Sequence, residues 1–261
     1  MCTEKKIADY AYAENRQMTT FTIPEGTTSI GKHAFYNCRS LEQLTLPHGN
    51  IEIEDGAFKN CSHLSQIILL DGTGDCTCVK DILYDMNHEI SVTIHYDNED
   101  IAKLLFPHYE YEYIANEPAR VFSEIGYGAG YIYQQCFYDS QMDYKRYDSL
   151  WKQALVSEDI SVLARILSYR LRFPHALEQS HREHYREYWD THTRELLIFY
   201  IQEQDMDSLR FFLEPTSADE KTFALAREIC ISLEQPGVLS FLLDLHQKTQ
   251  PTPSAISKFD L

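Results

Sequence analysis

The stretches AFYNCRSL (residues 34–41) and AFKNCSHL (residues 57–64) share the frame Ala-Phe-x-Asn-Cys-x-x-Leu and lie 23 residues apart. Cysteines in matched frames would suit a metal site, a disulfide or a structural repeat. Only a structural repeat requires the same offset to align residues outside the two stretches as well.

The 23-residue offset extends in both directions along the chain. It aligns Ile30 with Ile53 ahead of it and Cys38 with Asn15 behind it. The remaining matches place Ile23-Pro24 on Leu46-Pro47, Ala34-Phe35 on Ala11-Tyr12, and Leu41 on Leu64 and Met18. Three units therefore run to about residue 66. Units of this length stack on their neighbours, because one unit cannot bury its own apolar face.

Each unit contains one predicted strand. The segment LEQLTLP (41–47) alternates apolar and polar residues, which is typical of a short strand. Pro24 and Pro47 end the strands, because proline cannot donate a ladder hydrogen bond. Apolar residues at positions 30, 34 and 35 suit one helical or 3₁₀ turn on the opposite side of the unit.

These residues resemble BspA-type leucine-rich repeats, whose pattern is a strand, Leu-Pro, a variable turn, Ile-x-x-x-Ala-Phe and Asn-Cys-x-x-Leu. The resemblance covers about residues 5–70, and DILYDMNHEISVTIHY (81–96) resembles the irregular hairpin unit of such arrays. It implies a short leucine-rich-repeat solenoid over residues 1–96. Many members of that family are secreted or lie on the cell surface.

The repeat also favours one interpretation of the cysteines. In stacked units Cys38 and Cys61 lie one above the other, where a small side chain with a weak S–H donor fits a tight turn. We expect both to be buried, reduced and free of metal. Cys76 and Cys78, with His88 and His95, form a second candidate metal cluster. Their one-residue gap is shorter than the usual two to four, and an edge loop with one buried thiol is the favoured alternative.

The remainder is predicted to be an all-α domain over residues 97–250, followed by a flexible tail over 251–261, which makes the chain α+β. Helices are expected at 98–106, 116–126, 147–155 and 159–173. The segments 194–214 and 224–244 align at a 30-residue offset, and their helix pairs resemble ankyrin-like repeats. A leucine-rich array with such an end also resembles certain bacterial proteins.

Composition restricts partner and compartment. The 261 residues carry a formal net charge of −17, which repels phosphate backbones and disfavours nucleic-acid binding. We expect no transmembrane segment, because no apolar run is long enough. The first residues lack a secretory h-region, and seven cysteines form an odd, sparse set. The expected location is cytoplasmic, or secreted or surface-associated if a leader precedes this sequence.

Two segments look catalytic and have simpler explanations. GYGAGY (126–131) lacks the Gly-x-Gly-x-x-Gly spacing of a dinucleotide site, and we interpret it as a flexible interhelical turn. HREHYREYWDTH (181–192) brings three histidines together without the His-Glu-x-x-His order of zinc proteases, which favours an exposed helix. We therefore predict no enzyme activity, no cofactor and no metal.

The favoured function is a non-catalytic protein–protein interaction module or scaffold. Its contacts are predicted on the outward strand residues and on two tyrosines of the helical half: Thr20, Thr22, Gln43, Thr45, Gln66, Ile68, Tyr127 and Tyr131. The alternative is a small-ligand binder or enzyme with a site in the tyrosine-rich segment 109–138. A third possibility is self-association through uncapped repeats.

Overall fold

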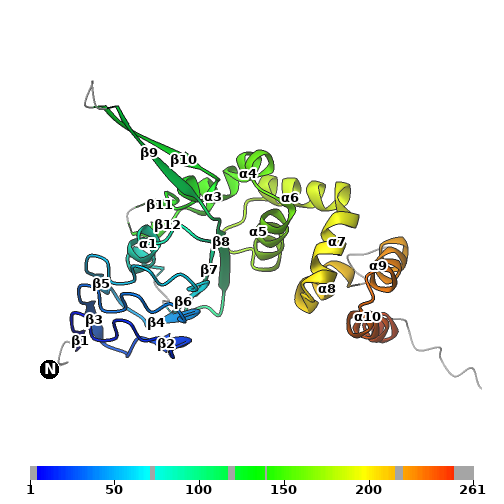
Figure 1. Ribbon diagram of the computed structural model, residues 1–261. Helices are drawn as coiled ribbons and strands as arrows, with labels where there is room; N and C mark the ends of the chain where they lie inside the picture. The colour runs from blue at the N-terminus through cyan, green and yellow to red at the C-terminus, as the bar shows by residue number, and fades with distance from the viewer. Residues whose placement is uncertain (1–4, 71–73, 117–120, 139, 215–219, 250–261) are drawn as a thin grey trace, which may run out of the picture. The chain divides into compact units, whose positions relative to one another are not determined.

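The computed structural model describes residues 5–70, 74–116, 121–138, 140–214 and 220–249, with the backbone alone between 111 and 127. The chain forms two compact units, residues 1–183 and 184–261. Figure 1 shows the helices and strands of both units.

The first unit begins as a solenoid whose main sheet has the strand order β2-β4-β6-β7-β8. The parallel strands are β2 (Thr20–Thr22), β4 (Gln43–Leu46), β6 (Gln66–Leu70) and β7 (Ile90–His95), and β8 (Ile101–Phe106) runs antiparallel to β7. Their register places Thr20, Gln43, Gln66 and Ser91 side by side. The predicted solenoid and its period are confirmed.

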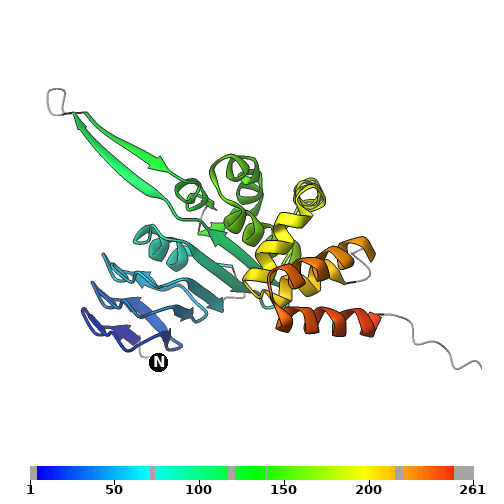
Figure 2. The same cartoon turned by 45° about the vertical axis from the view of Figure 1, so that its right-hand side comes forward.

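A second, three-stranded sheet forms the opposite wall of the solenoid. It consists of β1 (Lys5–Ile7), β3 (Thr27–Ile30) and β5 (Glu52–Ile53), all parallel. Short turns follow β3, with hydrogen bonds from Ala34 N to Gly31 O and from Cys38 N to Phe35 O. Figure 2 shows these coils stacked in chain order from blue to cyan.

Aromatic rings of successive coils stack inside the solenoid. The ring centroids of Tyr12 and Phe35 are 5.1 Å apart, and those of Phe35 and Phe58 are 4.9 Å apart. Phe35 and Phe58 are fully buried, as are Leu41 and Leu64 at the next equivalent positions. The 23-residue period in the sequence is therefore the period of the core.

The cysteines in the repeat frame link neighbouring coils. The thiol of Cys38 donates a hydrogen bond to Tyr12 O at 3.0 Å, and that of Cys61 donates to Phe35 O at 3.1 Å. Both are free and buried, as predicted. Asn15 differs, since its side-chain oxygen accepts from Gln17 N and Met18 N within its own turn.

Three expectations for the segment after residue 70 are wrong. Helix α1 (Thr77–Tyr84) precedes β7, so residues 81–96 are not a hairpin. Of the helix expected at 98–106, residues 101–106 form strand β8. Of the helix expected at 116–126, the described residues belong to strands, Asn116 to β9 (Glu110–Asn116) and residues 121–126 to β10 (Val121–Tyr127). The sheet thus continues beyond residue 96, where the sequence placed a domain boundary.

Pairing with β7 explains the strand at β8. Ala102, Leu104 and Phe106 are buried at every second position, which a strand needs and a helix does not. Leu105 on the other face is also buried. Two adjacent apolar residues, Leu104 and Leu105, also fit the spacing of a helix, which explains the wrong prediction. Strands β9 and β10 form an antiparallel hairpin that extends from the end of β8 in Figure 1.

The first unit continues with short elements and then longer helices. These are α2 (Gly130–Tyr133), β11 (Phe137–Tyr138), β12 (Gln141–Met142), α3 (Tyr144–Ser149), α4 (Trp151–Ser157), α5 (Ile160–Arg172) and α6 (Gln179–Thr191), the last reaching into the second unit. The helices expected at 147–155 and 159–173 are confirmed in α3, α4 and α5. Asp159 caps α5, because its Oδ1 accepts hydrogen bonds from Ser161 N and Val162 N.

Helix α5 covers the outward face of the sheet at β8. Lys103 Nζ lies 4.2 Å from the centroid of the Tyr169 ring, and Arg165 pairs with Glu89 just before β7. Strands β2, β4, β6 and β7 keep outward residues that are exposed or half-buried. The helix therefore sets one border of the outward strand face.

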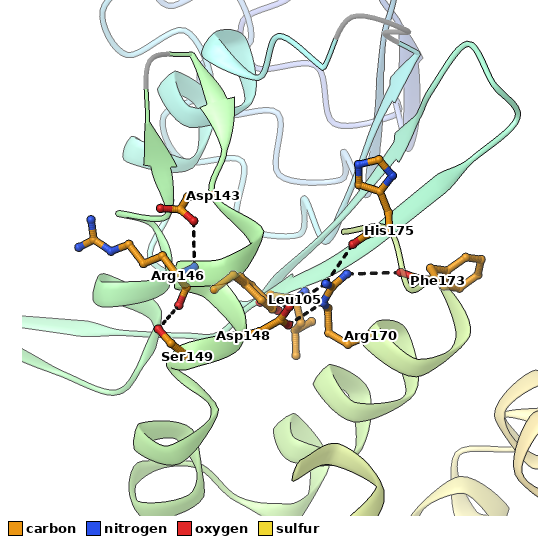
Figure 3. A network of polar contacts seen from close by, with 9 residues as sticks. Leu105, Asp143, Arg146, Asp148, Ser149, Arg170, Phe173 and His175 are labelled. Atoms are coloured by element: carbon orange, nitrogen blue, oxygen red, sulfur yellow. Dashed lines mark hydrogen bonds and ion pairs between the residues drawn. The ribbon is translucent and has the colours of Figure 1, made fainter. Parts of the chain in front are cut away.

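A buried polar network joins α3, α5 and β8. Arg170 of α5 pairs with Asp148 of α3 and also donates to the carbonyls of Phe173 and His175 (Figure 3). Tyr147 OH donates to Leu105 O and accepts from Leu105 N. This network fixes the segment that carries His175 after α5.

The second unit is helical and repeats at 30 residues. Helices α7 (Thr193–Gln202) and α8 (Met206–Leu213) are followed by α9 (Glu220–Ser232) and α10 (Pro236–Thr249). Gln204 and Glu234 occupy the two equivalent turns, and each has φ of 53°. Among the described helices of both units, no segment has the length and hydrophobicity needed to cross a bilayer.

Candidate functional site

The outward face of the main sheet carries two rows of side chains. One row contains Thr20, Gln43, Gln66 and Ser91, and the other contains Thr22, Thr45, Ile68 and Thr93. We call these eight residues the strand face. The six residues predicted as contacts on these strands all belong to the strand face. Ser91 and Thr93 were not predicted, because residues of β7 pair with residues of β6 that lie 25 positions earlier in the sequence, not 23.

The strand face is uncharged and, apart from Ile68, polar. Thr20, Thr22 and Gln66 are exposed, and the other five are half-buried. No member is acidic, although the chain has 40 Asp and Glu among its 261 residues. The inward neighbours Leu44, Leu46, Ile67 and Leu69 are buried and fix the alternation of the strands. The face can offer hydroxyl and amide groups to a partner without opposing charge.

The two tyrosines predicted as partner contacts do not belong to the strand face. Tyr127 lies on β10, where side chains are outside the described residues. Tyr131 lies on α2, is 38% exposed, and lines a different cavity. The structure therefore groups Tyr131 with residues of α1 and β11.

This cavity, which we call the α1–α2 groove, has a volume of about 300 Å³. Its lining residues come from α1, α2, the turn after α2 and β11: Lys80, Asp81, Tyr84, Tyr131, Gln134, Gln135 and Phe137. Gln134 fixes α2 against α1, because its Nε2 donates to Leu83 O and Met86 O at 3.0 and 2.9 Å. Leu83 lies in the last turn of α1, where helix carbonyls need external donors, and Met86 follows the C-cap residue of the helix.

Two glycines of GYGAGY allow α2 to sit this close. A Cβ at Gly130 would overlap the carbonyl oxygen of Pro107, and one at Gly128 would lie 2.7 Å from His108 O. Gly128 also has φ of +89°, a conformation that other residues rarely adopt. This segment was expected to be a flexible interhelical turn. It instead joins β10 to α2 and passes close to the backbone of Pro107 and His108.

A second cavity, of about 180 Å³, contains a cluster of hydrogen-bonding side chains. Tyr96 OH and Tyr144 OH lie 2.5 Å apart, and the ring of His175 stacks on that of Tyr96 with centroids 4.1 Å apart. His175 Nδ1 lies 2.6 Å from Asp100 Oδ2. Gly74, Gln141 and Met142 complete the lining.

The electrostatics of this second cavity favour neutral phenols. Burial raises the pKa of Tyr96 to about 12 and raises the pKa of Tyr144 still further. Of the two phenol protons, only one can lie between the two oxygens, which leaves the other to donate elsewhere. The cavity is suited to binding a small polar molecule.

Sequence reasoning missed this cluster for a physical reason. Asp100 and His175 are 75 residues apart, and Tyr96 and Tyr144 are 48 apart. No spacing rule links them, since they meet only where α5 returns along β8. The isolated bridge between Ala102 and Pro174 marks that contact.

The other candidates from the sequence lie in ordinary structural positions. Cys76 and Cys78 are both buried, not one as expected, and the Cys76 thiol donates to Gly74 O. His88 Nε2 lies 2.7 Å from Leu64 O, linking two coils. Helix α6 carries His181 and His184, both half-buried, whereas His192 is the N-cap residue of α7. Among the described side chains, no three of the His, Cys, Asp or Glu type converge to hold a metal ion.

Comparison with known proteins identifies the solenoid. Residues 5–117 match the family described as BspA type Leucine rich repeat region (6 copies). The match includes all the coils and extends over β8 and β9. No curated protein and no solved structure matches the chain.

Proposed function

Since residues 5–117 match the BspA-type leucine-rich repeats, we propose that the protein is a non-catalytic interaction module that binds a protein partner through the strand face. Leucine-rich repeats typically serve protein interaction. The observation that carries the proposal is the strand face itself: two regular rows of exposed or half-buried, uncharged side chains on a rigid sheet.

The adjoining helices add to this proposed surface. Helix α5 borders the strand face at β8, where Lys103 and Tyr169 pair. A partner lying across the strands would therefore also meet α5. We further propose that the helix pairs of the second unit are ankyrin-like and provide an interaction surface of their own, on the basis of their 30-residue repeat.

Affinity capture from native lysate tests the proposal. The wild-type chain is compared with the double variant Gln43→Ala/Thr45→Ala, and Glu52→Ala on the opposite sheet serves as the control. Thr45 and Gln43 lie at the centre of the strand face, where truncation affects binding most. We expect the double variant to lose a partner that both wild type and control retain. Equal capture by all three would rule out the strand face.

A second candidate function, small-ligand binding, has specific support. The sequence predicted it for residues 109–138, and Tyr131 of that segment lines the α1–α2 groove. The stronger chemical support comes from the cavity of Tyr96, Tyr144 and His175. A thermal-shift screen with small polar metabolites checks it, because a ligand that binds only the folded state raises Tm saturably. Stabilisation that persists in Tyr96→Phe/Tyr144→Phe would argue against that cavity.

Self-association through the first coil is a third candidate. Tyr12 and Phe21 are half-buried there, whereas Phe35 and Phe58 of the following coils are fully buried. Apolar residues at the end of a repeat array favour association. Light scattering over a concentration series measures the molar mass; a constant value of 30.5 kDa excludes this candidate.

A further inference from the structure

The α1–α2 groove has aromatic walls that reach solvent. Tyr84 is 83% exposed and Tyr131 is 38% exposed, although tyrosine has a large apolar surface. Phe137 is half-buried at the same cavity, where its ring stacks with Phe106 at a centroid distance of 5.8 Å. Exposed aromatic side chains around a concave site are typical anchors for a bound protein segment.

The groove also contains a carboxylate that no described residue neutralises through an ion pair. Asp81 is half-buried on α1, and no hydrogen bond or ion pair to it occurs within the described part of the chain. Burial raises its pKa above the usual 3.8, and the charge of Lys80 opposes that rise. The rise means that the ionised form has lost hydration that nothing in the groove fully replaces.

Lys80 is poorly placed to neutralise the Asp81 carboxylate. Residues at i and i+1 of a helix do not face each other, and among the described side chains Lys80 and Asp81 form no ion pair although both line the groove. Lys80 is exposed, and its flexible side chain can move into solvent. A cation supplied from outside would therefore meet Asp81 beside the rings of Tyr84 and Tyr131.

We propose that the α1–α2 groove binds an arginine side chain of a protein partner, with its guanidinium paired to Asp81 and stacked on Tyr84 and Tyr131. A planar guanidinium suits both contacts, because it pairs with a carboxylate through two N–H groups and stacks on aromatic rings. Gln134 adds an acceptor, since its amide nitrogen donates to Leu83 O and Met86 O, while no described residue donates to its amide oxygen.

The charge of the whole chain supports this occupant. A net charge of −17 attracts a basic segment over long distances and speeds its encounter. The cavity volume of about 300 Å³ is at the lower end of ordinary ligand sites, which suits one side chain rather than a folded element. The inference rests on the proposed function only in taking the occupant to be part of a protein.

Peptide titration followed by amide NMR tests the inference directly. The probe is acetyl-Gly-Arg-Gly-amide, added to the full chain at neutral pH and low salt. The matched probe replaces arginine by citrulline, which keeps the shape and removes the charge. We expect weak, saturable shifts of amides at residues 80–84 and 131–137 with the arginine peptide. Equal shifts with the citrulline peptide would overturn the proposal.

Variants with opposite expected effects sharpen the test. Asp81→Asn removes the charge with little change of shape, and we expect it to weaken arginine-peptide binding by at least about fivefold. Lys80→Gln removes a nearby positive charge and is expected to strengthen it. Glu25→Gln, in the exposed turn between β2 and β3 of the first coil, is the control and leaves binding unchanged. Unchanged binding in Asp81→Asn, or equal binding of the corresponding lysine peptide, would contradict the proposal.

The pH dependence has a defined direction. Arginine-peptide binding requires ionised Asp81, so it is present at neutral pH and lost as pH falls through the raised pKa of Asp81. The loss is expected at a higher pH than for an ordinary aspartate. Binding that persists down to pH 3.8 would contradict the role of Asp81.

The two proposals fail separately. The variant Gln43→Ala/Thr45→Ala changes the strand face and leaves the α1–α2 groove intact, so it is expected to bind the arginine peptide normally. Loss of partner capture in that variant with normal peptide binding supports both sites. Peptide binding that is absent in wild type removes the groove proposal and leaves the strand-face experiment valid.

Discussion

The guanidinium of Arg170 and the carboxylate of Asp148 are both fully buried and face each other through two hydrogen bonds. Nε lies 2.7 Å from Oδ1, and Nη2 lies 2.8 Å from Oδ2. Arg170 also donates to Phe173 O and His175 O, so the pair connects two helices with the segment after α5 (Figure 3).

Removing one member of this pair is predicted to destabilise the first unit strongly. In Arg170→Met the Asp148 carboxylate stays buried without its cation, which lowers the free energy of unfolding by about 3–5 kcal/mol. Urea unfolding followed by circular dichroism measures the change. The double variant Arg170→Met/Asp148→Leu leaves no buried charge, so we expect it to regain part of the loss. A single variant within about 1 kcal/mol of wild type would contradict this account.

Gly130→Ala is predicted to weaken the contact between α2 and the segment after β8. The added Cβ would overlap Pro107 O, so backbone must shift. We expect a loss of about 1–3 kcal/mol in unfolding free energy, as for other overpacked sites. Gly237→Ala is the matched control: its Cβ meets no atom within 4 Å, and alanine favours helix α10. The prediction fails if both variants change stability in the same direction.

The cap of α5 is predicted to depend on pH. Hydrogen bonds from Ser161 and Val162 lower the pKa of Asp159 below 3.8. The pKa of Asp159 is lower in the folded protein than in the unfolded chain. The stabilisation by the ionised carboxylate is therefore fully present at pH values above the unfolded pKa, and it is lost as pH falls through the folded pKa.

Asp159→Ala is therefore expected to lose about 1 kcal/mol of unfolding free energy at neutral pH. Asp159→Asn keeps the accepting oxygen and is the control. Chemical denaturation at pH 7 and at successively lower pH gives the comparison. The difference between wild type and Asp159→Ala should shrink below pH 3.8; a difference that grows there would refute the assignment.

The thiol of Cys61 is predicted to react slowly in the folded protein. Burial raises its pKa to about 12 and raises the pKa of Cys38, so little thiolate exists at pH 8. A variant with Cys2→Ser and all other cysteines except Cys61 replaced isolates the signal. Thiol-reagent absorbance should rise slowly without urea and at once in urea. Fast labelling of the folded protein would show that Cys61 is accessible.

Much of the solenoid could be predicted because its information is local and repeated. Each coil places Ala-Phe and Asn-Cys in the same frame, so one pattern specifies the strand, the turn and the stacked core. The strand face followed from the alternation of the same strands. Ser91 and Thr93 were the exceptions, because α1 enters between β6 and β7 and changes the spacing.

The α1–α2 groove and the Tyr96–His175 cavity could not be predicted in this way. The groove needs Gln134 to reach the α1 carbonyls, and the cavity needs His175 to return to Asp100. Tyr131 was predicted from the sequence as a partner contact, whereas Asp81 and Tyr84, which line the same groove, were not singled out because they lie about 50 residues earlier in α1.

By itself, the sequence determined the coil period, the buried cysteines and the outward rows, since a repeated unit has the same environment in every coil. Tertiary structure alone decided that residues 101–106 pair as a strand with β7, although their apolar spacing also suits a helix. The reason is that α5 buries Leu105 from one face while β7 and the core bury Leu104 from the other. A strand that is buried on both faces no longer alternates apolar and polar residues. Its sequence alone therefore does not distinguish it from a helix, and the packing of the neighbouring elements decides.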